Sequence, residues 1–352
     1  MNSDKKICAV VVTYNRKDLL LECLEALKNQ SKPLDAIYIV DNASSDGTNE
    51  ILLKKEYIEE LPKDHSNKDW KRYSTIQNST NKDINICYIK LNENTGGAGG
   101  FYEGVKGAYE DGYDWLWLMD DDAEPLKDSL ERLTDYISED NISALASVVK
   151  TVDNRIVPLH RKIFDFKSLR NFNISKTVDP ELIENNKVLK IDDASFVGVL
   201  INRTSIKEIG FPKKEFFIHG DDTEYSIRLR SVGEILLIND SVILHQTNFN
   251  ASKYVKKSIF GRTVYRAKYK NYWLNYYAVR NNTWLLKKYR QPALFIWIIL
   301  LFSWLVSASA IILLDDHKYK RIKFLTSAYL DGLKNNFDNG KPRRILYNQP
   351  IN

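Results

Sequence analysis

The first 120 residues alternate short apolar runs with amphipathic segments, and this alternation constrains the fold more than any other feature. Mainly apolar runs of strand length stand at 7–13, 36–40, 84–91 and 113–119. Between them, apolar positions recur at helical spacing over 19–30, 46–55 and 101–112. Strands that alternate with helices in this way form a sheet covered by helices on both faces. We therefore expect an α/β fold with a mostly parallel sheet.

The segment 60–83 interrupts this pattern, because it is polar and aperiodic, and we interpret it as a surface insertion. The chain has three cysteines without paired spacing, and its first residues, MNSDKK, are charged. These features argue against a disulfide scaffold and against a secretory signal. They predict that the catalytic part lies in the cytosol.

Polar residues follow the predicted strands at the point where each strand ends. In open α/β sheets, ligands bind beyond the carboxyl ends of the strands. The polar tips are Thr13-Tyr14-Asn15, Asp41-Asn42, Asn94-Thr95-Gly96-Gly97 and Asp120-Asp121-Asp122. The four tips therefore predict one binding site along a single edge of the sheet.

The aspartate triplet 120–122 is the most informative of these tips. Clustered carboxylates raise one another's pKa unless a cation neutralises them, so that a divalent metal held by Asp120 and Asp122 explains the triplet. The alternative is a polar loop in which Asp122 caps a helix that begins near Pro125.

The stretch NTGGAGG, residues 94–100, places four glycines in five positions. Such a turn lets the backbone approach a ligand and offers free N–H groups ahead of a helix. It is neither a Walker A loop nor a dinucleotide fingerprint. By itself it can be a tight turn, but beside an acidic metal site it indicates a ligand that carries phosphate.

The C-terminal part of the chain is basic and contains a long uncharged segment. Residues 251–352 hold 19 Lys and Arg against 4 Asp and Glu, a net charge of +15, whereas residues 1–250 carry −10. The run 292–314 has no charge and is long enough to cross a bilayer. Basic residues flank it on both sides, so a re-entrant or interfacial helix competes with a single span, and a buried bundle helix is the alternative.

We expect this region to contact the anionic cytoplasmic face of the cell membrane. Nucleic-acid binding by the basic region is a remote alternative, because the charge surrounds an apolar run instead of lining a groove. The expected division is a catalytic domain over 1–250 and a basic helical region over 251–352.

The motifs together carry a resemblance to a known family. The stretches VVVTYNRKDLLLECLEAL, IVDNASSDGT, NTGGAGGF and WLMDDDAEP, in this order and spacing, resemble the nucleotide-binding half of family 2 glycosyltransferases, which are inverting enzymes. The resemblance continues through 196–233 and covers about residues 6–248. It is greatest to the branch of bacterial galactofuranosyltransferases and rhamnosyltransferases, and it implies the GT-A nucleotide-diphospho-sugar transferase fold.

The resemblance implies a role for each matching residue. Asp120 and Asp122 would hold Mn²⁺ or Mg²⁺ against the donor diphosphate, and His245 would complete the metal site. Asp221 would be the catalytic base, with Asp222 beside it, although Asp222 is also an acceptable helix N-cap. The nucleotide-binding set would be Thr13, Asn15, Asp41, Asn94, Gly96, Gly97 and Asp121. The element Arg280-Asn281-Asn282 matches a motif of this branch, but we assign it no chemistry.

The predicted function is inverting transfer of a sugar from a nucleotide-diphosphate donor to a lipid-linked surface polysaccharide. Galactofuranose from UDP-galactofuranose is the first choice of donor, and rhamnose from dTDP-rhamnose is the second. A hypothesis from another class is a catalytically silent, membrane-bound protein that binds sugar nucleotides and serves in assembly. The residues of the expected site argue against it, because a silent protein needs no base.

Overall fold

The computed structural model describes residues 5–62, 69–166, 172–246, 251–259, 262–290 and 293–348. The chain divides into two compact units, which we describe separately. Unit 1 comprises Met1–Ile163, Thr177–Lys214 and Asp221–Gln246, and unit 2 comprises Phe164–Lys176, Glu215–Gly220 and Thr247–Asn352. Unit 2 therefore includes two short stretches from the middle of the chain.

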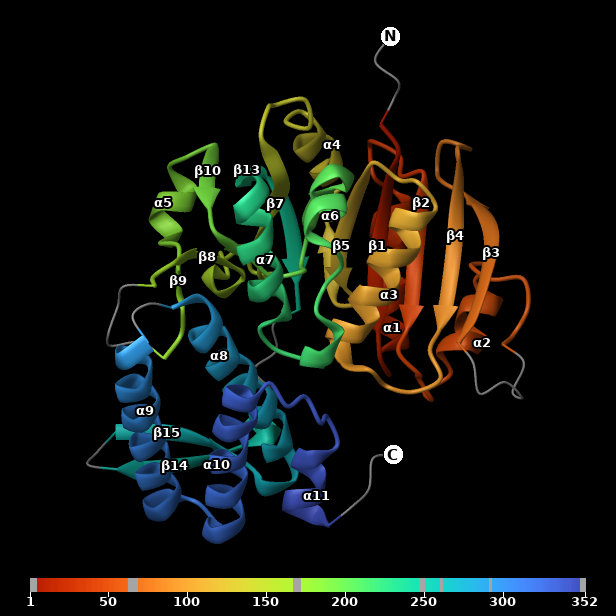
Figure 1. Cartoon of the computed structure of the whole chain (residues 1–352). Coiled ribbons are helices and arrows are strands. Elements are labelled where there is room, and N and C mark those ends of the chain that lie inside the picture. Colours follow the sequence, from red (N-terminus) through yellow and green to blue (C-terminus); the bar gives the residue numbers. More distant parts are fainter. Residues whose placement is uncertain are drawn as a thin grey trace. The chain divides into compact units, whose positions relative to one another are not determined.

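A mixed sheet forms the centre of unit 1 (Figure 1). Its order, in the part of the chain that the structure describes, is β10-β13-β7-β12-β5-β1-β2-β4-β3, and β6 pairs with β13. The pairs from β4 to β5 are parallel, as the sequence predicts, whereas β12 is antiparallel to both β5 and β7. The strands are β1 (Ile7–Thr13), β2 (Ala36–Asp41), β3 (Trp70–Gln77), β4 (Asp83–Lys90), β5 (Trp115–Asp120), β6 (Ala123–Pro125), β7 (Ile142–Lys150), β10 (Val188–Ile191), β12 (Val199–Asn202) and β13 (Glu234–His245).

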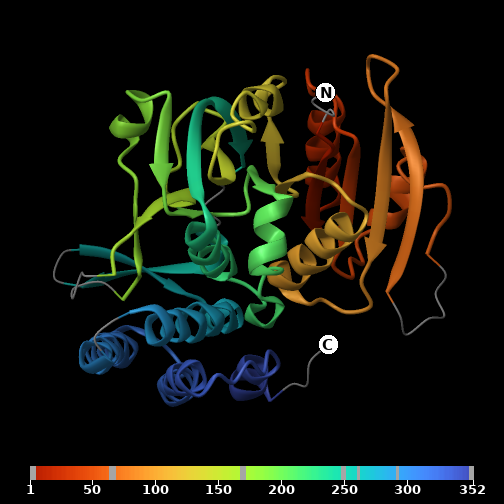
Figure 2. The ribbon, with the colours of Figure 1, turned by 45° about the horizontal axis from the view of Figure 1, so that its top comes forward.

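Helices cover both faces of this sheet, and Figures 1 and 2 show α3, α6 and α7 on one face. Apolar side chains of α1, α2 and α4 share one core cluster with Ala9 and Val11 of β1, while those of α3, α6 and α7 share the other with Val10 and Val12. Alternate residues of one buried strand thus face the two helical layers. The helices are α1 (Lys17–Lys28), α2 (Thr48–Lys54), α3 (Gly96–Glu110), α4 (Ser129–Thr134), α5 (Pro180–Glu184), α6 (Arg203–Ile209) and α7 (Asp221–Val232).

Helix α3 begins at Gly96, so the glycines predicted to form a turn before a helix at 101 lie within the helix. At two of the glycine positions of α3, a side chain would collide with β1. A Cβ at Gly100 would lie 2.5 Å from Val12 Cγ1, and one at Gly104 would lie 2.4 Å from Val10 Cγ1. The glycines therefore allow α3 to pack closely on β1.

Strand β3 lies inside the segment that we interpreted as an insertion. It forms the antiparallel edge of the sheet beside β4, with Tyr73 opposite Cys87. Most of its side chains are partly or fully exposed, and only Trp70 is buried. An edge strand with little burial shows no apolar run, and for this reason the sequence pattern did not indicate it.

Two smaller sheets complete the strands. Strand β11 (Asp193–Ala194) pairs antiparallel with β8 (Arg161–Phe164), and a further short strand, β9, runs from Ser175 to Thr177. In unit 2, β14 (Tyr254–Ile259) and β15 (Arg262–Ala267) pair antiparallel. This hairpin lies in a region that the sequence predicted to be helical.

The described elements of unit 2 that follow β15 are helical. They enclose a small aromatic core that includes Tyr272, Tyr276 and Phe324. The long apolar helix of this unit, α9, matches the predicted segment 292–314 to within one residue and is long and apolar enough to cross a membrane. The helices are α8 (Asn275–Tyr289), α9 (Ala293–Leu314), α10 (Lys318–Lys334) and α11 (Lys341–Tyr347), preceded by a 3₁₀ turn at Tyr269–Leu274.

Candidate active site

The ends of two strands bring two carboxylates and an imidazole together in unit 1. Asp120 ends β5, Asp122 follows two residues later, and His245 ends β13. One ligand atom from each of the three lies within 4.8 Å of the others. Asp122 does not cap the next helix, which begins at Ser129. The three residues predicted to bind a metal are therefore neighbours.

The electrostatics of this cluster suit a divalent cation. Burial, followed by the charges of Asp122 and Asp121, raises the pKa of Asp120 well above its usual range. His245 Nε2 lies 3.1 Å from Asp122 Oδ1. Burial raises the pKa of Asp122, but the interaction with His245 outweighs burial, and the pKa is lowered. Buried His245 Nδ1 has no hydrogen-bond partner among the described residues. Two carboxylates and one imidazole fit Mn²⁺ or Mg²⁺.

Asp121 faces β1 and an arginine that the sequence analysis missed. Thr13 Oγ1 donates a hydrogen bond of 2.8 Å to Asp121 Oδ2. Arg16 Nη1 lies 3.2 Å from Asp121 Oδ1 and 2.7 Å from Asp122 Oδ2. Burial raises the pKa of Asp121 to about 6, while Arg16 and Thr13 act in the opposite direction. The only sequence signal for Arg16 was its position directly behind the polar tip of β1.

Asn15 and Asp41, two predicted nucleotide ligands, shape the loops at the ends of β1 and β2. Asn15 has a left-handed backbone with φ of 55°, and its Oδ1 accepts a hydrogen bond from the N–H of Ser45 at 2.7 Å. Asp41 is fully buried, and its carboxylate accepts hydrogen bonds from the N–H of Ser44 and the hydroxyl of Tyr88. Both residues lie at the predicted edge, and their contacts with a nucleotide remain a prediction.

The start of α3 is attached to the end of β2. Asn42 Nδ2 donates to the carbonyl oxygen of Gly96, and Asn42 Oδ1 accepts from the N–H of Thr95. Asn94 Oδ1 accepts from the N–H of Gly96 at 2.8 Å. A Cβ added at Gly97 would have no atom within 4 Å. Gly97 therefore borders open space at the same edge of the sheet, where a ligand would find room.

Asp221 and Asp222 open helix α7. Asp221 is only 8% exposed, and burial, followed by the charge of Asp222, raises its pKa to about 8. Burial also raises the pKa of Asp222, while the charge of Lys162 opposes this effect. Asp222 lies in the first turn of the helix instead of at its N-cap. A carboxyl group with a pKa near 8 accepts a proton more readily than an ordinary aspartate.

Two residues of the chain around β8, His160 and Lys162, interact with the metal-ligand candidate His245 and with Asp222, respectively. The sequence analysis missed both. The ring of His160 lies edge-to-face with that of His245, with centroids 5.0 Å apart. Lys162, two residues later, lies 3.2 Å from Asp193 Oδ2 and is the cation that acts on Asp222. No local motif marks these residues, because their partners lie more than 30 residues away in the sequence.

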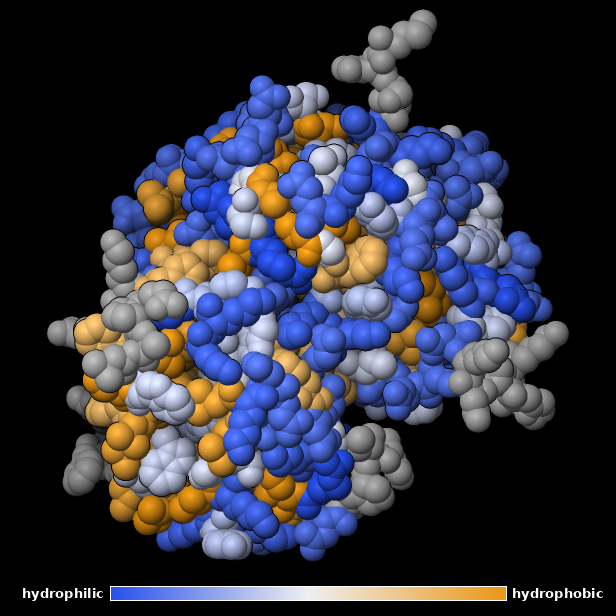
Figure 3. Space-filling model, viewed as in Figure 1, coloured by the Kyte–Doolittle hydropathy of each residue, from blue (hydrophilic) through white to orange (hydrophobic). Residues whose placement is uncertain are grey.

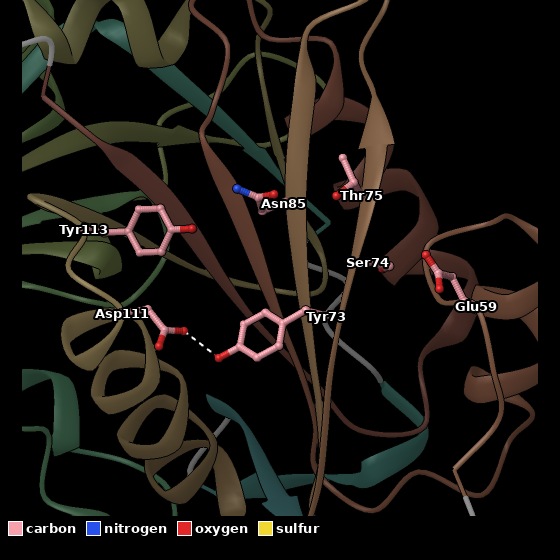
Figure 4. A pocket seen from close by; sticks show the side chains of 7 residues that line it. All are labelled: Glu59, Tyr73, Ser74, Thr75, Asn85, Asp111 and Tyr113. Carbon is pink, nitrogen blue, oxygen red and sulfur yellow. Dashed lines mark hydrogen bonds between the residues drawn. The ribbon is translucent and has the colours of Figure 1, made fainter.

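A cavity of about 430 Å³ lies elsewhere in unit 1, beside the edge strand β3 (Figure 4). Asp111 and Tyr113 of its lining stand between α3 and β5, at the end of the sheet opposite to Asp120. Asp111 Oδ2 accepts a 2.7 Å hydrogen bond from the hydroxyl of Tyr73. The cavity is therefore separate from the candidate active site. Its lining residues are Glu59, Tyr73, Ser74, Thr75, Asn85, Asp111 and Tyr113.

A mixed sheet flanked by helices, with an acidic cluster at its carboxyl edge that could hold a metal ion, matches the GT-A fold. The model of the glycosyl transferase family 2 matches residues 8–210, which is more than half of the chain. The chain belongs to this family, and the predicted enzyme class, a glycosyltransferase, is confirmed.

Two relatives narrow the branch of the family. Galactofuranosyltransferase GlfT1 of Mycolicibacterium smegmatis is 27% identical over 234 residues, which cover 65% of this chain and 67% of that protein. GlfT1 of Mycobacterium tuberculosis strain H37Rv is 28% identical over 230 residues, 64% of each chain. The match thus spans about two thirds of the length of these relatives.

Solved structures confirm the fold. TarS 1–349 of S. aureus in complex with UDP superposes with a TM-score of 0.53 at 15% identity, covering 97% of this chain and 86% of that one. GalNAc-T7 with UDP, GalNAc and Mn²⁺ gives a TM-score of 0.52 at 14% identity, covering 95% and 57%. At these identities the likeness concerns the fold alone.

Proposed function

We propose that the protein is a metal-dependent, inverting galactofuranosyltransferase that uses UDP-galactofuranose. The observation that carries this proposal is the cluster of Asp120, Asp122 and His245 at the carboxyl edge of a GT-A sheet. The similarity to GlfT1 enzymes supports galactofuranose as the sugar. The two UDP-bound neighbours support a uridine diphosphate donor.

The proposed mechanism assigns the leaving diphosphate to the metal edge. Asp120, Asp122 and His245 would hold Mn²⁺ or Mg²⁺, which stabilises the negative charge that develops on the diphosphate. Arg16 supplies a further cation, because it already bridges Asp121 and Asp122. The open side of Gly97 gives the donor room to approach the start of α3.

Asp221 would act as the base that accepts the proton of the acceptor hydroxyl. Its raised pKa of about 8 makes the carboxylate a stronger base than an exposed aspartate. Deprotonation of the hydroxyl is coupled to attack on the anomeric carbon, opposite the departing diphosphate. This geometry inverts the configuration and needs no protein nucleophile. Burial and the charge of the adjacent Asp222 together raise the pKa of Asp221.

The acceptor would be a glycan on a membrane lipid, and α9 would bring the protein to the cytoplasmic face of the membrane. One face of α9 packs on α10, where Trp304 Nε1 donates to Thr326 Oγ1 at 3.0 Å. The opposite face exposes large apolar side chains, visible as an orange area over α9 in Figure 3. These side chains are Phe295, Trp297, Ile298, Leu301, Phe302, Leu305, Val306, Ile312 and Leu313.

Charge supports an anionic lipid surface as the partner of this face. The four acidic residues of 251–352, Asp315, Asp316, Asp331 and Asp338, all form ion pairs. The excess of basic residues is therefore not balanced by free carboxylates, and lysines such as Lys288 and Lys318 near the two ends of α9 are exposed. Because one face of α9 packs on the charged helix α10, we propose that α9 lies in the interface instead of crossing the bilayer.

The catalytic proposal is tested by donor hydrolysis. Purified protein with Mn²⁺ is incubated with UDP-galactofuranose, UDP-galactose, UDP-glucose and dTDP-rhamnose, and release of nucleoside diphosphate is measured. We expect release from UDP-galactofuranose alone, lost in Asp221→Asn and kept in Asp153→Asn, a matched control because Asp153 is exposed.

Other outcomes separate the alternatives. Release from dTDP-rhamnose alone would identify a rhamnosyltransferase. Metal-dependent binding of UDP with no turnover, even with a lipid-linked galactan acceptor, would indicate a silent sugar-nucleotide binder. Absence of any nucleotide binding would refute the proposed site.

Vesicle flotation tests the membrane proposal. We expect the protein to float with phosphatidylcholine vesicles that contain a quarter phosphatidylglycerol, and to be released by 1 M NaCl, because salt screens the lysine charges. Phe302→Glu should abolish flotation, whereas Leu159→Glu, an equally exposed position in unit 1, should not. Binding that resists salt and alkaline extraction would contradict an interfacial helix.

A further inference from the structure

The motif Arg280-Asn281 of α8 received no role from the sequence, yet it is completely buried. Arg280 is 0% and Asn281 is 1% exposed. Arg280 forms no ion pair with a carboxylate among the described residues, and burial lowers its pKa to about 10. A buried guanidinium without an acidic partner is costly, so its remaining contacts are informative.

One of these contacts is to a side chain, since Arg280 Nη1 donates to Asn339 Oδ1 at 2.9 Å. The others are mainly to the backbone of one short loop, Glu215–Gly220, which belongs to the same unit. Asn281 Nδ2 donates to the carbonyl oxygens of Phe216, Ile218 and His219 at 3.0, 3.1 and 2.8 Å. Arg280 Nη2 donates to the carbonyls of Glu215 and Phe216 at 3.2 and 3.0 Å. Arg280 Nε also donates to Asn281 Oδ1 at 2.9 Å and so orients the amide group.

The loop needs such support because its backbone is strained. Phe217 and His219 have φ of 65° and 70°, in the left-handed region that disfavours side chains with a Cβ. Such a backbone conformation is unfavourable and persists only where its surroundings impose it. The ring of Phe217 stacks on Tyr277 of α8, with centroids 4.7 Å apart, which adds an apolar anchor.

The loop leads directly into Asp221 through Gly220, whose φ is 81°. The loop therefore fixes the backbone up to the residue that directly precedes Asp221 in the chain. We propose that Arg280 and Asn281 are positioning residues, which hold the Phe216–Gly220 loop and thereby place the carboxylate of Asp221. This inference rests on the proposed role of Asp221 as the base.

Kinetics of the full chain test the proposal. Asn281→Ala removes the three hydrogen bonds to the loop, and misplacement of a catalytic group by about 1 Å can cost roughly a hundredfold in rate. We expect kcat to fall by about 10- to 100-fold while the Kd of UDP and of Mn²⁺ changes less than about twofold. Arg280→Lys keeps the positive charge but loses the planar guanidinium group and its several N–H donors. Its kcat should therefore also fall, but by less than in Asn281→Ala.

Asn282→Ala is the matched control. Asn282 donates to the carbonyl of Phe172 and makes no contact with the loop in the described residues, so its kcat should be unchanged. Wild-type kcat in both Asn281→Ala and Arg280→Lys would overturn the proposal. Loss of UDP binding together with kcat would also overturn it, because that result indicates a general structural role.

The double variant Asn281→Ala/Asp221→Asn separates this inference from the proposed function. If Asn281 acts through Asp221, its substitution should cause no further loss in an Asp221→Asn background. An additive loss would refute the positioning role. If instead wild-type protein releases no nucleoside diphosphate, or Asp221→Asn retains full turnover, the proposed catalytic function fails first.

Discussion

The close packing of α3 on β1 gives a quantitative prediction for Gly104→Ala. The added Cβ would lie 2.4 Å from Val10 Cγ1 and 3.0 Å from Val40 Cγ2. Both valines lie in central strands and are stiff at χ1, so they cannot move aside cheaply. Overpacking of this kind costs about 1–3 kcal/mol, and the higher helix propensity of alanine returns about 1 kcal/mol. We expect a net loss of up to about 2 kcal/mol in the free energy of unfolding of unit 1.

Urea denaturation followed by tryptophan fluorescence measures this loss, since Trp115 and Trp117 are buried in the same sheet. Gly97→Ala is the control, because a Cβ there meets no atom within 4 Å. Its stability should be equal to that of the wild type or higher by up to about 1 kcal/mol, while its affinity for UDP should fall. A Gly104→Ala variant as stable as Gly97→Ala would refute the packing argument.

Three further predictions follow from the charges. Asp120→Asn should weaken Mn²⁺ binding at least about tenfold in titration calorimetry, because one carboxylate ligand is lost. Since burial and Asp222 raise the pKa of Asp221 to about 8, the base is protonated below that pH, and kcat should rise with pH until about 8 in a pH–rate profile. Asp315→Ala removes the buried carboxylate that pairs with Arg266 and Arg321, while Arg321 keeps Asp316, and it should destabilise unit 2 by up to about 3 kcal/mol in urea denaturation.

The sequence was sufficient for those parts of the fold whose signal is local. The runs that became β1, β2 and β5 are buried almost throughout, so each appears as an apolar run, and β4 is buried continuously over 86–89. Strand β3 gave no such signal, because it is an edge strand that exposes most of its side chains. The glycines of α3 were misassigned to a turn, since their close contact with β1 is a tertiary property.

The same distinction applies to the candidate site. Asp120 and Asp122 were identifiable because a polar triplet directly after an apolar run is visible in the sequence. Arg16 and His160 were not, because their partners are remote in the chain: Arg16 meets Asp121 across 105 residues, and His160 meets His245 across a comparable interval. Pairing of this kind follows from strand order, which the sequence pattern does not specify.

The structure also explains how a buried strand can end on three aspartates. Asp121 accepts hydrogen bonds from Thr13 and Arg16. Asp122 lies 2.7 Å from the guanidinium of Arg16 and 3.1 Å from the imidazole of His245. No described residue donates a hydrogen bond to the carboxylate of Asp120, and its pKa is correspondingly raised well above the usual range.

The three charges are therefore not equivalent. Arg16 forms ion pairs with the second and third carboxylates, whereas burial and the neighbouring charges raise the pKa of the first. Because a metal ligand must be ionised and the pKa of Asp120 is raised, metal affinity should rise with pH when it is measured by titration calorimetry. The single positive charge of Arg16 cannot balance three carboxylates, so a divalent metal would complete the charge balance at this edge of the sheet.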